Sequence, residues 1–360
     1  MTVAYKWFGT ELWQVCRVGR KVTLTMSNPI LVEVLRGALV ESRHCGAIAV
    51  SEAGGRLVLA LGDVHQPVYP RSAIKALQAL TLVESGAADR FGLEAEELAL
   101  ACASHSGEPG HVATATRMLA RAGLEPSALK CGAHWPIHQP SGQALARAGG
   151  SASPLHNNCS GKHAGFLCTA CAMDAERGSY FEPAHPVQRE VRGSLEALGG
   201  TAIGEDVCAT DGCSVPTWAM PLAALARAFA GFGSGQGLAP DRAKAAGRLR
   251  EACAAHPWHV AGTRRFDTEL MTAFGARVFV KGGAEGVHCA ALPELGLGIA
   301  VKCDDGAGRA AEVMMAATLA RLFASDTDRA ALAPFLRPTL RNWNGMAVGS
   351  LRPAAALAGK

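Results

Sequence analysis

Two groups of strand-like segments, one toward each end, place the strongest limit on how this chain of 360 residues can fold. Residues 46–50 (GAIAV) and 56–61 (RLVLAL) flank a two-glycine turn and predict a β-hairpin. Residues 276–281 (ARVFVK) and 297–302 (LGIAVK) also alternate as strands do, with glycine-rich turns between them. The sequence therefore predicts an α+β fold, in which both ends of the chain build one sheet and the middle is helical.

Apolar residues recur at helical spacing over most of the chain between these strands. Residues 30–41 alternate like a further strand, and a stretch rich in glycine, proline and histidine predicts a long loop at 131–155. The expected helices lie at residues 72–84, 94–103, 111–122, 166–173, 222–232, 242–255 and 309–324.

The composition is that of a globular enzyme. Hydrophobic residues make up 49% of the chain and charged residues 18%, which suffices for a large core. We expect a single catalytic unit over residues 26–360, preceded by an N-terminal extension at 1–25. The extension lacks the continuous apolar run of a signal peptide, which favours a cytoplasmic protein.

Charge and cysteine patterns narrow the possible partners further. The net charge of +4 is spread along the chain without a Lys/Arg block, so nucleic acid is not an expected partner. No apolar run approaches the ~20 residues that a membrane span needs. The 12 cysteines are scattered rather than grouped as a disulfide framework, so we expect them to be reduced, as in the cytoplasm.

Ser72 and Lys75 begin the first predicted helix and form the pattern S-x-x-K. Residues three apart in a helix share a face, so the hydroxyl and the amine are neighbours. A lysine can accept the serine proton only when neutral, and burial and the positive end of a helix both disfavour its charged form. Serine acyl-transfer enzymes related to β-lactamases and penicillin-binding proteins use this arrangement. The alternative is a capping serine beside a solvated lysine.

Two later segments supply a second serine and a second lysine. Ser104 follows a predicted helix, and Lys281 ends a predicted strand just before Gly283. β-Lactamase-like sites use S-x-x-K, a loop serine and a lysine-small-glycine strand in this order. Backbone N–H groups of Ser72 and of the strand near Gly283 are candidates for an oxyanion hole. Alternatively, Lys281 is a surface lysine at a strand end.

Cys159 and either Lys162 or His163 lie on one predicted helical turn, and Cys213 follows a Thr-Asp-Gly turn. Two thiolates with an imidazole or a neutral amine could hold a zinc ion. The spacing also fits two buried thiols of the core, which is the simpler interpretation of the residues alone.

Five longer motifs resemble those of one known family. They appear in the order PRSAIKALQAL, LALACASHSGEPGHV, LKCGAHWP, NNCSGKHAGFL and ATDGCSVPTWAMPL. The chain resembles the rhizobial-type (class 3) L-asparaginases, also called the asparaginase II family, from about Asn28 to its C-terminus. It departs from the family pattern at Ala76, where proline is usual, and at Ile74, where the residue is usually smaller. Neither change removes a functional group, although both lie beside the site.

This resemblance implies a β-lactamase/penicillin-binding-protein-like (serine glutaminase-like) fold and a homodimer. It also implies hydrolysis of L-asparagine to L-aspartate and ammonia. Two serine–lysine pairs are implied, Ser72 with Lys75 and Ser104 with Lys281. In the expected route, Ser72 forms a β-aspartyl ester that water then hydrolyses.

The resemblance further implies a Zn²⁺ site formed by the residues that match Cys159, Lys162 and Cys213, which replaces the interpretation as core thiols. His163 and Asp211 then become candidates for supporting the metal site or binding the substrate. Because the substrate is a small zwitterion, its two charges need partners. The candidates for these partners are Arg71 and Asp211.

Two other functions fit parts of the sequence. A β-lactam- or peptide-processing serine hydrolase shares the S-x-x-K chemistry, but it normally acts outside the membrane and would need an export signal. A non-catalytic zinc or thiol sensor could use the cysteines, but it would leave Ser72 and Ser104 without a role.

Overall fold

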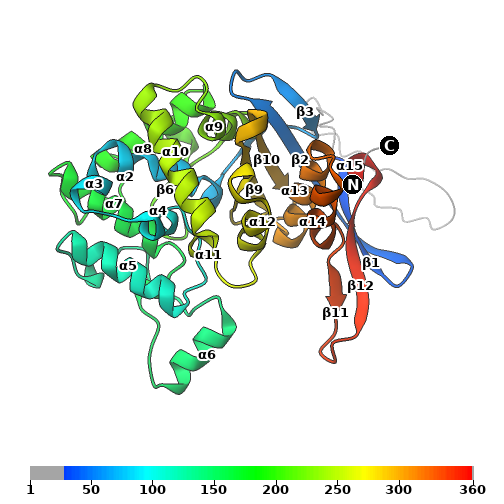
Figure 1. The fold of residues 1–360 in the computed structure, drawn as a ribbon, viewed down its shortest axis with the longest axis horizontal. Helices are drawn as coiled ribbons and strands as arrows, with labels where there is room; N and C mark the ends of the chain where they lie inside the picture. The colour runs from blue at the N-terminus through cyan, green and yellow to red at the C-terminus, as the bar shows by residue number, and fades with distance from the viewer. Residues whose placement is uncertain (1–27, 359–360) are drawn as a thin grey trace, which may run out of the picture.

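The computed structural model describes residues 28–358, so the predicted extension at residues 1–25 lies outside it. Its central feature is an eight-stranded antiparallel sheet with the order β11-β12-β1-β2-β10-β9-β8, in which β3 also pairs with β2. Figure 1 shows this sheet beside a large helical region. The strands of the sheet are β1 (Ile30–Arg36), β2 (Leu39–Glu52), β3 (Leu57–Leu61), β8 (Phe279–Gly282), β9 (Val287–Leu292), β10 (Leu297–Cys303), β11 (Thr339–Arg341) and β12 (Ala347–Pro353).

The long strand β2 joins the two ends of the chain. Its first half pairs with β1, and its second half lies between β3 and β10, with Val50 opposite both Leu59 and Ile299. Two short antiparallel pairs lie outside this sheet, namely β4 (Pro67–Val68) with β7 (Met220–Pro221), and β5 (Cys208–Thr210) with β6 (Pro216–Trp218). The predicted α+β class, with strands from both ends and helices between them, is confirmed.

Helices form most of the remaining structure. The α-helices are α1 (Lys75–Gln78), α2 (Leu80–Glu84), α3 (Ala87–Arg90), α4 (Ala95–Ala101), α5 (Pro109–Arg121), α6 (Gln139–Arg147), α7 (Ser160–Ala172), α8 (Pro186–Gly199), α9 (Leu222–Ser234), α10 (Pro240–Ala255), α11 (Pro257–Val260), α12 (Phe266–Phe274), α13 (Gly308–Leu322), α14 (Asp326–Leu336) and α15 (Ala355–Ala358). The 3-10 turns are η1 (Arg71–Ile74), η2 (Pro126–Ala128), η3 (Pro154–His156), η4 (Glu205–Val207), η5 (Gly275–Arg277) and η6 (Pro293–Leu295).

The structure corrects the predicted elements in three places. The single helix expected at 72–84 is divided into η1, α1 and α2, because every residue from 73 to 82 is buried and tertiary packing sets its backbone. The expected loop at 131–155 contains α6, which has a proline in its first turn, where a helix tolerates it. The strand expected at 30–41 is a hairpin, because Gly37 turns the chain with φ of 55°.

Helix α7 begins at Ser160, six residues before the predicted start at 166, and passes very close to α4. A Cβ atom on Gly161 would lie 2.3 Å from the carbonyl oxygen of Leu100, so only glycine allows this approach. The first turn of α7 is fully buried although it carries Lys162 and His163. Burial of such polar residues points to a functional role for this turn.

Helices cover both faces of the sheet. Helix α9 packs against β2, β9 and β10, and a Cβ atom on Gly298 of β10 would meet the Ala226 carbonyl oxygen of α9 at 2.1 Å. Helix α13 packs against β9, β10 and β12, and its Met314 side chain lies over Gly46 of β2. Figure 1 shows α13 and α14 at the sheet, with α5, α7 and α8 farther out in the helical region.

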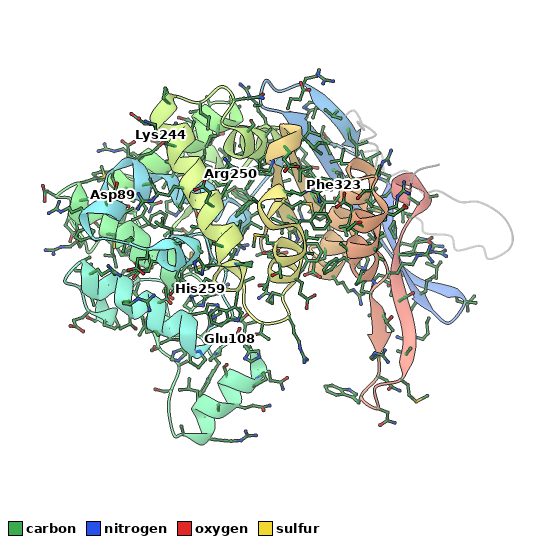
Figure 2. The ribbon with its side chains drawn as sticks, in the orientation of Figure 1. Asp89, Glu108, Lys244, Arg250, His259 and Phe323 are labelled. Atoms are coloured by element: carbon green, nitrogen blue, oxygen red, sulfur yellow. The ribbon has the colours of Figure 1, made fainter. Side chains whose placement is uncertain are left out.

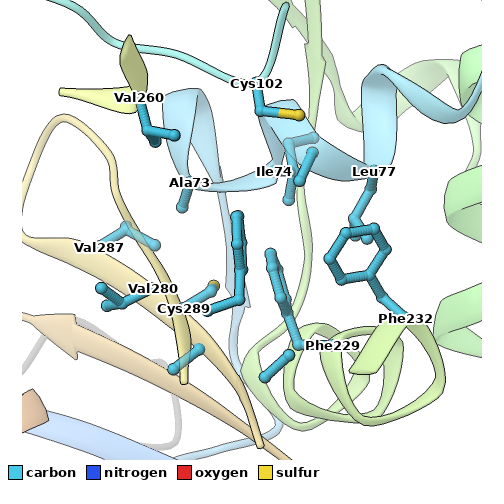
Figure 3. Packing of buried hydrophobic residues seen from close by; sticks show 14 of the residues in the cluster. Ala73, Ile74, Leu77, Cys102, Phe229, Phe232, Val260, Val280, Val287 and Cys289 are labelled. Carbon is cyan, nitrogen blue, oxygen red and sulfur yellow. The ribbon is translucent and has the colours of Figure 1, made fainter. Parts of the chain in front are cut away.

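A continuous apolar core joins the helical region to the sheet. Figure 3 shows Ile74 and Leu77, from η1 and α1, beside Phe229 and Phe232 of α9. The rings of Phe232 and Phe279 of β8 are 5.5 Å apart, centre to centre. The segment that carries S-x-x-K is therefore fixed between sheet and helices.

Two further observations concern membrane-spanning helices and the state of the cysteines. None of the helices within residues 28–358 is both long and apolar enough to span a bilayer. The cysteines in this described part of the chain are free thiols, as their scattered placement predicts.

Candidate active site

Ser72 lies on η1, directly after Pro70 and Arg71. Arg71 has φ of 50°, a left-handed conformation that is uncommon for a residue with a side chain and is often found at functional sites. The Ala73 N–H donates to the Pro70 carbonyl at 3.0 Å and closes the turn. Ala73 is buried in the core, whereas Ser72 remains partly accessible. The turn thus anchors the chain while leaving the serine open to a substrate.

The end of β8 lies against this turn. A Cβ atom on Gly283 would be 2.8 Å from the Pro70 carbonyl oxygen and 2.9 Å from the Ala73 nitrogen, so the contact requires glycine. The Gly283 N–H donates to Val287 at 2.7 Å, and the Gly282 N–H donates to a carboxylate at 2.9 Å. These two N–H groups are therefore engaged within the protein, and the oxyanion hole expected near Gly283 cannot use them.

Lys75 is fully buried at the start of α1. Its Nζ donates to the carbonyl oxygens of Ala103, at 2.6 Å, and Asn158, at 3.2 Å. The amine thus joins three segments: the S-x-x-K turn, the loop that carries Ser104, and the start of α7. Its hydrogen bonds within residues 28–358 go to these carbonyl oxygens and not to the Ser72 hydroxyl. Such a difference is common without substrate, because catalytic hydrogen bonds often form only once the substrate is bound.

Ser104 follows α4 in a loop braced by neighbouring segments. Its N–H donates to the Val260 carbonyl at 2.9 Å. Figure 2 marks Glu108 farther along the loop, where its carboxylate accepts from the Thr263 N–H and hydroxyl at 2.8 and 2.7 Å. The Ser104 hydroxyl is buried and has no hydrogen-bond partner among residues 28–358. Such a hydroxyl is rare and calls for a functional explanation.

Lys281 is the second buried lysine, at 1% exposure on β8. Its Nζ donates to the Gly282 carbonyl and lies 3.7 Å from the Asp267 carboxylate. Burial lowers the pKa of Lys281 to about 8, Asp267 opposes this change, and the positive charge of Lys75 adds to it. The Lys75 charge is thus close enough to disfavour the charged form of Lys281, and Lys281 is not a surface lysine.

Cys159, Lys162 and Cys213 come together behind the serines, as the zinc hypothesis requires. The Lys162 Nζ donates to the Cys213 Sγ at 3.0 Å. A hydrogen bond from the Cys213 thiol and the charges of Lys75 and Lys162 hold the pKa of Cys159 well below its usual range, against the effect of burial. Burial alone would lower the pKa of Lys162, but the two sulfurs outweigh it and raise that pKa. The surroundings thus favour the thiolate form of Cys159.

Arg71 and Asp211 form an ion pair next to Ser72, between the guanidinium Nε and a carboxylate oxygen. Burial tends to raise the pKa of Asp211, but Lys162 and Arg71 prevail and lower it. Arg71 and Asp211, the two residues predicted to bind the charges of the substrate, thus lie next to the serine. In the structure they form an ion pair with each other. His163 lies apart from this pair, with Nδ1 2.6 Å from the Tyr180 hydroxyl.

His44, Cys303 and Asp305 form another group of possible metal ligands, with atoms within 4.8 Å of one another. The Asp305 carboxylate accepts from His44 Nδ1 at 2.6 Å, from Cys303 Sγ at 2.9 Å and from the Ala307 N–H at 3.0 Å. These hydrogen bonds explain the group as a cap where β10 ends. The sulfur–amine set at Cys159 remains the better candidate for a metal site.

Two open cavities lie near the serines and lysines but are not lined by them. A polar cavity of about 840 Å³ is lined by residues that include Tyr69, Lys302 and Asp304. An apolar cavity of about 540 Å³ lies between α5 and α6 and includes Val112 and Leu145. Ser72 is partly accessible, whereas Ser104 and the two lysines behind it are buried, and so little free space favours a small substrate.

Some residues of the site escaped prediction from the sequence. Asp267 reaches Lys281 from the first turn of α12, and the Asn158 carbonyl accepts from Lys75. Asp267 lies outside the five motifs, and although Asn158 belongs to NNCSGKHAGFL, the group that contacts Lys75 is its backbone carbonyl. A carboxylate in the first turn of a helix is common, because it complements the helix dipole, and a backbone carbonyl leaves no sequence signal at all. Only the packing of α12 on β8 shows the first of these contacts.

The model of the family described as L-asparaginase II matches residues 32–353. A comparison with curated proteins gives no match.

Several solved structures are distantly similar. A β-lactamase from Mycobacterium bovis is 16% identical, with a TM-score of 0.37, over 81% of this chain and 94% of that one. The protein Mglu in its native form is 13% identical, with a TM-score of 0.39, over 85% of this chain and 67% of that one. Another Mglu structure is 14% identical, with a TM-score of 0.41, over 83% of this chain and 73% of that one. At these TM-scores the likenesses carry no conclusion about activity.

Gly283→Ala tests the contact between β8 and η1. We expect the free energy of unfolding to fall by about 1–3 kcal/mol, because the new methyl group meets backbone atoms that cannot rotate away. Urea denaturation measures this change. The control, Gly193→Ala, lies on the exposed side of α8 with open space around it, and should raise stability by about 0.5–1 kcal/mol. Equal effects of the two substitutions would contradict the contact.

Proposed function

Since this chain belongs to the L-asparaginase II family, it is an amidohydrolase of the L-asparaginase type, and we propose that it works through a serine ester. In this route Ser72 attacks the side-chain amide carbon of L-asparagine, ammonia leaves, and water hydrolyses the β-aspartyl ester to L-aspartate. The observation that carries the proposal is the placement of two buried lysines beside two serines, one of which has an unpartnered hydroxyl.

The first step needs a base for Ser72. Lys75 is three residues away and fully buried, and its amine donates to two backbone carbonyl oxygens and lies beside the Cys159 sulfur. A neutral amine has two N–H donors, which are enough to make both carbonyl hydrogen bonds and leave its lone pair for a proton. The neutral amine takes the hydroxyl proton as the serine oxygen bonds to the amide carbon.

The second step needs a proton for the departing nitrogen. Ser104 and Lys281 pass this proton, so that the C–N bond breaks with loss of neutral ammonia rather than an amide anion. A pKa of about 8 suits Lys281 for this task, because the amine can both take up and release a proton near neutral pH. A water molecule then attacks the ester and gives a proton to Lys281 through Ser104, while Lys75 returns its proton to the departing Ser72 oxygen, so that both amines end as they began.

The substrate carries an α-carboxylate and an α-ammonium, which need opposite charges next to Ser72. The Arg71–Asp211 ion pair offers both, and exchange of partners with the zwitterion keeps all four charges compensated. His163 supports the site from behind, since it is buried beside the cysteines and its pKa is lowered by that burial, which keeps it neutral.

The donor set at Cys159, Lys162 and Cys213 fits a zinc ion. The Lys162 Nζ lies 3.0 Å from the Cys213 Sγ, and a hydrogen bond from Cys213 lowers the pKa of Cys159. A metal ion would displace the proton that Lys162 otherwise keeps, since the sulfurs raise the pKa of this amine. These residues would hold Zn²⁺ with one position open, where it supplies a Lewis acid. Cys159 begins α7 just after Asn158, so a bound ion would also fix the loop whose carbonyl receives Lys75.

We further propose that the enzyme acts in the cytoplasm as a homodimer on a small-molecule substrate. Reduced cysteines throughout the described residues suit that compartment. The exposed side chains of Trp135 and Ile137, each 49% accessible, suit burial between two copies.

Ser72→Ala should reduce kcat for asparagine by about three orders of magnitude or more, because the ester can no longer form. Stability should change by less than about 1 kcal/mol, since Ser72 is only partly buried and the start of η1 does not rely on a side-chain cap. Ammonia release and thermal unfolding measure the two effects, with Ser350→Ala on β12 as a control. Activity within a few-fold of the unmodified enzyme would move the nucleophile to Ser104. Turnover of nitrocefin in place of asparagine would favour a β-lactam hydrolase.

Removal of the metal should raise KM for asparagine more than it lowers kcat, because no proposed bond-making step passes through the ion. Cys159→Ala and Cys213→Ala should each lose about one zinc per chain by elemental analysis, whereas Cys168→Ala, a buried thiol elsewhere on α7, should keep it. Occupancy should fall at low pH, where protons compete for the ligands. Protein purified without chelator that holds no zinc, and gains none when zinc is added, would contradict the metal assignment.

A further inference from the structure

Within residues 28–358, the Lys281 amine forms an ion pair with the Asp267 carboxylate, at 3.7 Å. Asp267 lies in the first turn of α12 and is 4% exposed. One of its oxygens accepts the Gly282 N–H at 2.9 Å, and the other lies 2.9 Å from His288 Nε2. The carboxylate thus has its position fixed from β8 and β9 at once, and it has little freedom to move away from the lysine.

Local packing keeps the His288 ring in contact with Asp267. His288 lies opposite Gly282 in the β8–β9 register, and a Cβ atom on Gly282 would come within 2.8 Å of the ring. The glycine therefore makes room for the imidazole. On its other side, the ring of Phe266 lies 5.2 Å away in an edge-on arrangement. The space at Gly282 and the contact with Phe266 together fix the orientation in which the imidazole meets the carboxylate.

Four other ionisable groups act on Lys281 and Asp267. Arg265, just before α12, and Lys75 lower the pKa of Lys281, whereas Cys159 raises it. Burial raises the pKa of Glu312 on α13, which faces Asp267 and His288. Among the described residues, Asp267 is thus the carboxylate nearest to Lys281 and the one that opposes the effect of burial on its proton.

We propose that Asp267, oriented by His288, is a positioning residue that holds the Lys281 amine at the reaction centre and sets the pH at which it loses its proton. The inference rests on the proposed serine–lysine mechanism, in which Lys281 passes a proton. His288 acts on the lysine only through the carboxylate. In many enzymes a carboxylate orients the catalytic base, and here the carboxylate orients a lysine instead.

The direction of the effect follows from the charges. The Asp267 carboxylate favours the ammonium form of Lys281 and so raises its pKa toward 8 from the lower value that burial alone would give. Asp267→Asn keeps the shape and a hydrogen-bond acceptor but removes the charge. The neutral amine should then appear at lower pH, by about one unit or more for a charge removed at this distance.

Two measurements test this. The first follows the Lys281 side chain by NMR in protein labelled with ¹³Cε-lysine, with the resonance identified by its loss in Lys281→Arg. The midpoint should lie near pH 8 in the unmodified enzyme and at least one unit lower in Asp267→Asn. The second follows kcat/KM for asparagine against pH. The ionisation near pH 8 should move to lower pH by the same amount, which changes the ratio of activities at pH 6 and pH 9 by about tenfold.

Two variants control for structural damage. Asp267→Glu restores the charge and should return the midpoint toward that of the unmodified enzyme. Asp305→Asn removes the half-exposed carboxylate that pairs with buried His44, which faces no catalytic lysine, and should leave both measurements unchanged. If Asp267→Asn does not fold, His288→Gln takes its place, and a smaller shift in the same direction is expected because the carboxylate is held less firmly.

An unmoved Lys281 midpoint in folded Asp267→Asn overturns the inference, even if Ser72 is proven to be the nucleophile. An equal shift in Asp305→Asn also overturns it, because the effect would then be indirect. A midpoint that moves while the pH profile of kcat/KM stays in place contradicts the proton relay through Lys281, and with it the functional half of the inference.

Discussion

The contact between the η1 turn and the end of β8 is the constraint on which the site depends. A strand can approach a helical turn this closely only where it carries no side chain, and Gly283 meets that condition against Pro70 and Ala73. The same approach brings Ser72 and Lys75, from one side, to the strand that carries Lys281. Without it, the two serine–lysine pairs would belong to separate parts of the molecule.

Three lysines in this small region are almost completely buried: Lys75 at 0%, Lys162 at 3% and Lys281 at 1% exposure. An isolated ammonium in such a place is very costly, so the partner of each amine determines what the amine can do. Lys75 has carbonyl oxygens, Lys162 has sulfur, and Lys281 has a carboxylate. Because of this chemical difference, we assign the role of base to Lys75, of metal ligand to Lys162 and of proton relay to Lys281.

The sequence predicted the parts of the site better than their contacts. The S-x-x-K pattern and the lysine-glycine strand end predicted Ser72, Lys75 and Lys281 as candidates, because each lies in a motif with a fixed local geometry, and the structure brings the segments that carry them together. The α+β class followed from strands at both ends. In contrast, Asp267 and His288 are brought to Lys281 by packing between α12, β8 and β9, which no local pattern records. The helix breaks near Ala79 were missed for the same reason, since burial rather than helix propensity shapes that segment.

The central claim is that asparagine is cleaved through an ester on Ser72. The most direct test is to quench the reaction with acid during turnover of ¹³C-labelled asparagine, digest the enzyme, and locate the label by peptide mass spectrometry. The account predicts an aspartyl ester on the peptide that contains Ser72, which disappears as substrate is exhausted. Label on the Ser104 or Cys159 peptide instead, or no covalent label under conditions that trap other acyl-enzymes, would contradict it.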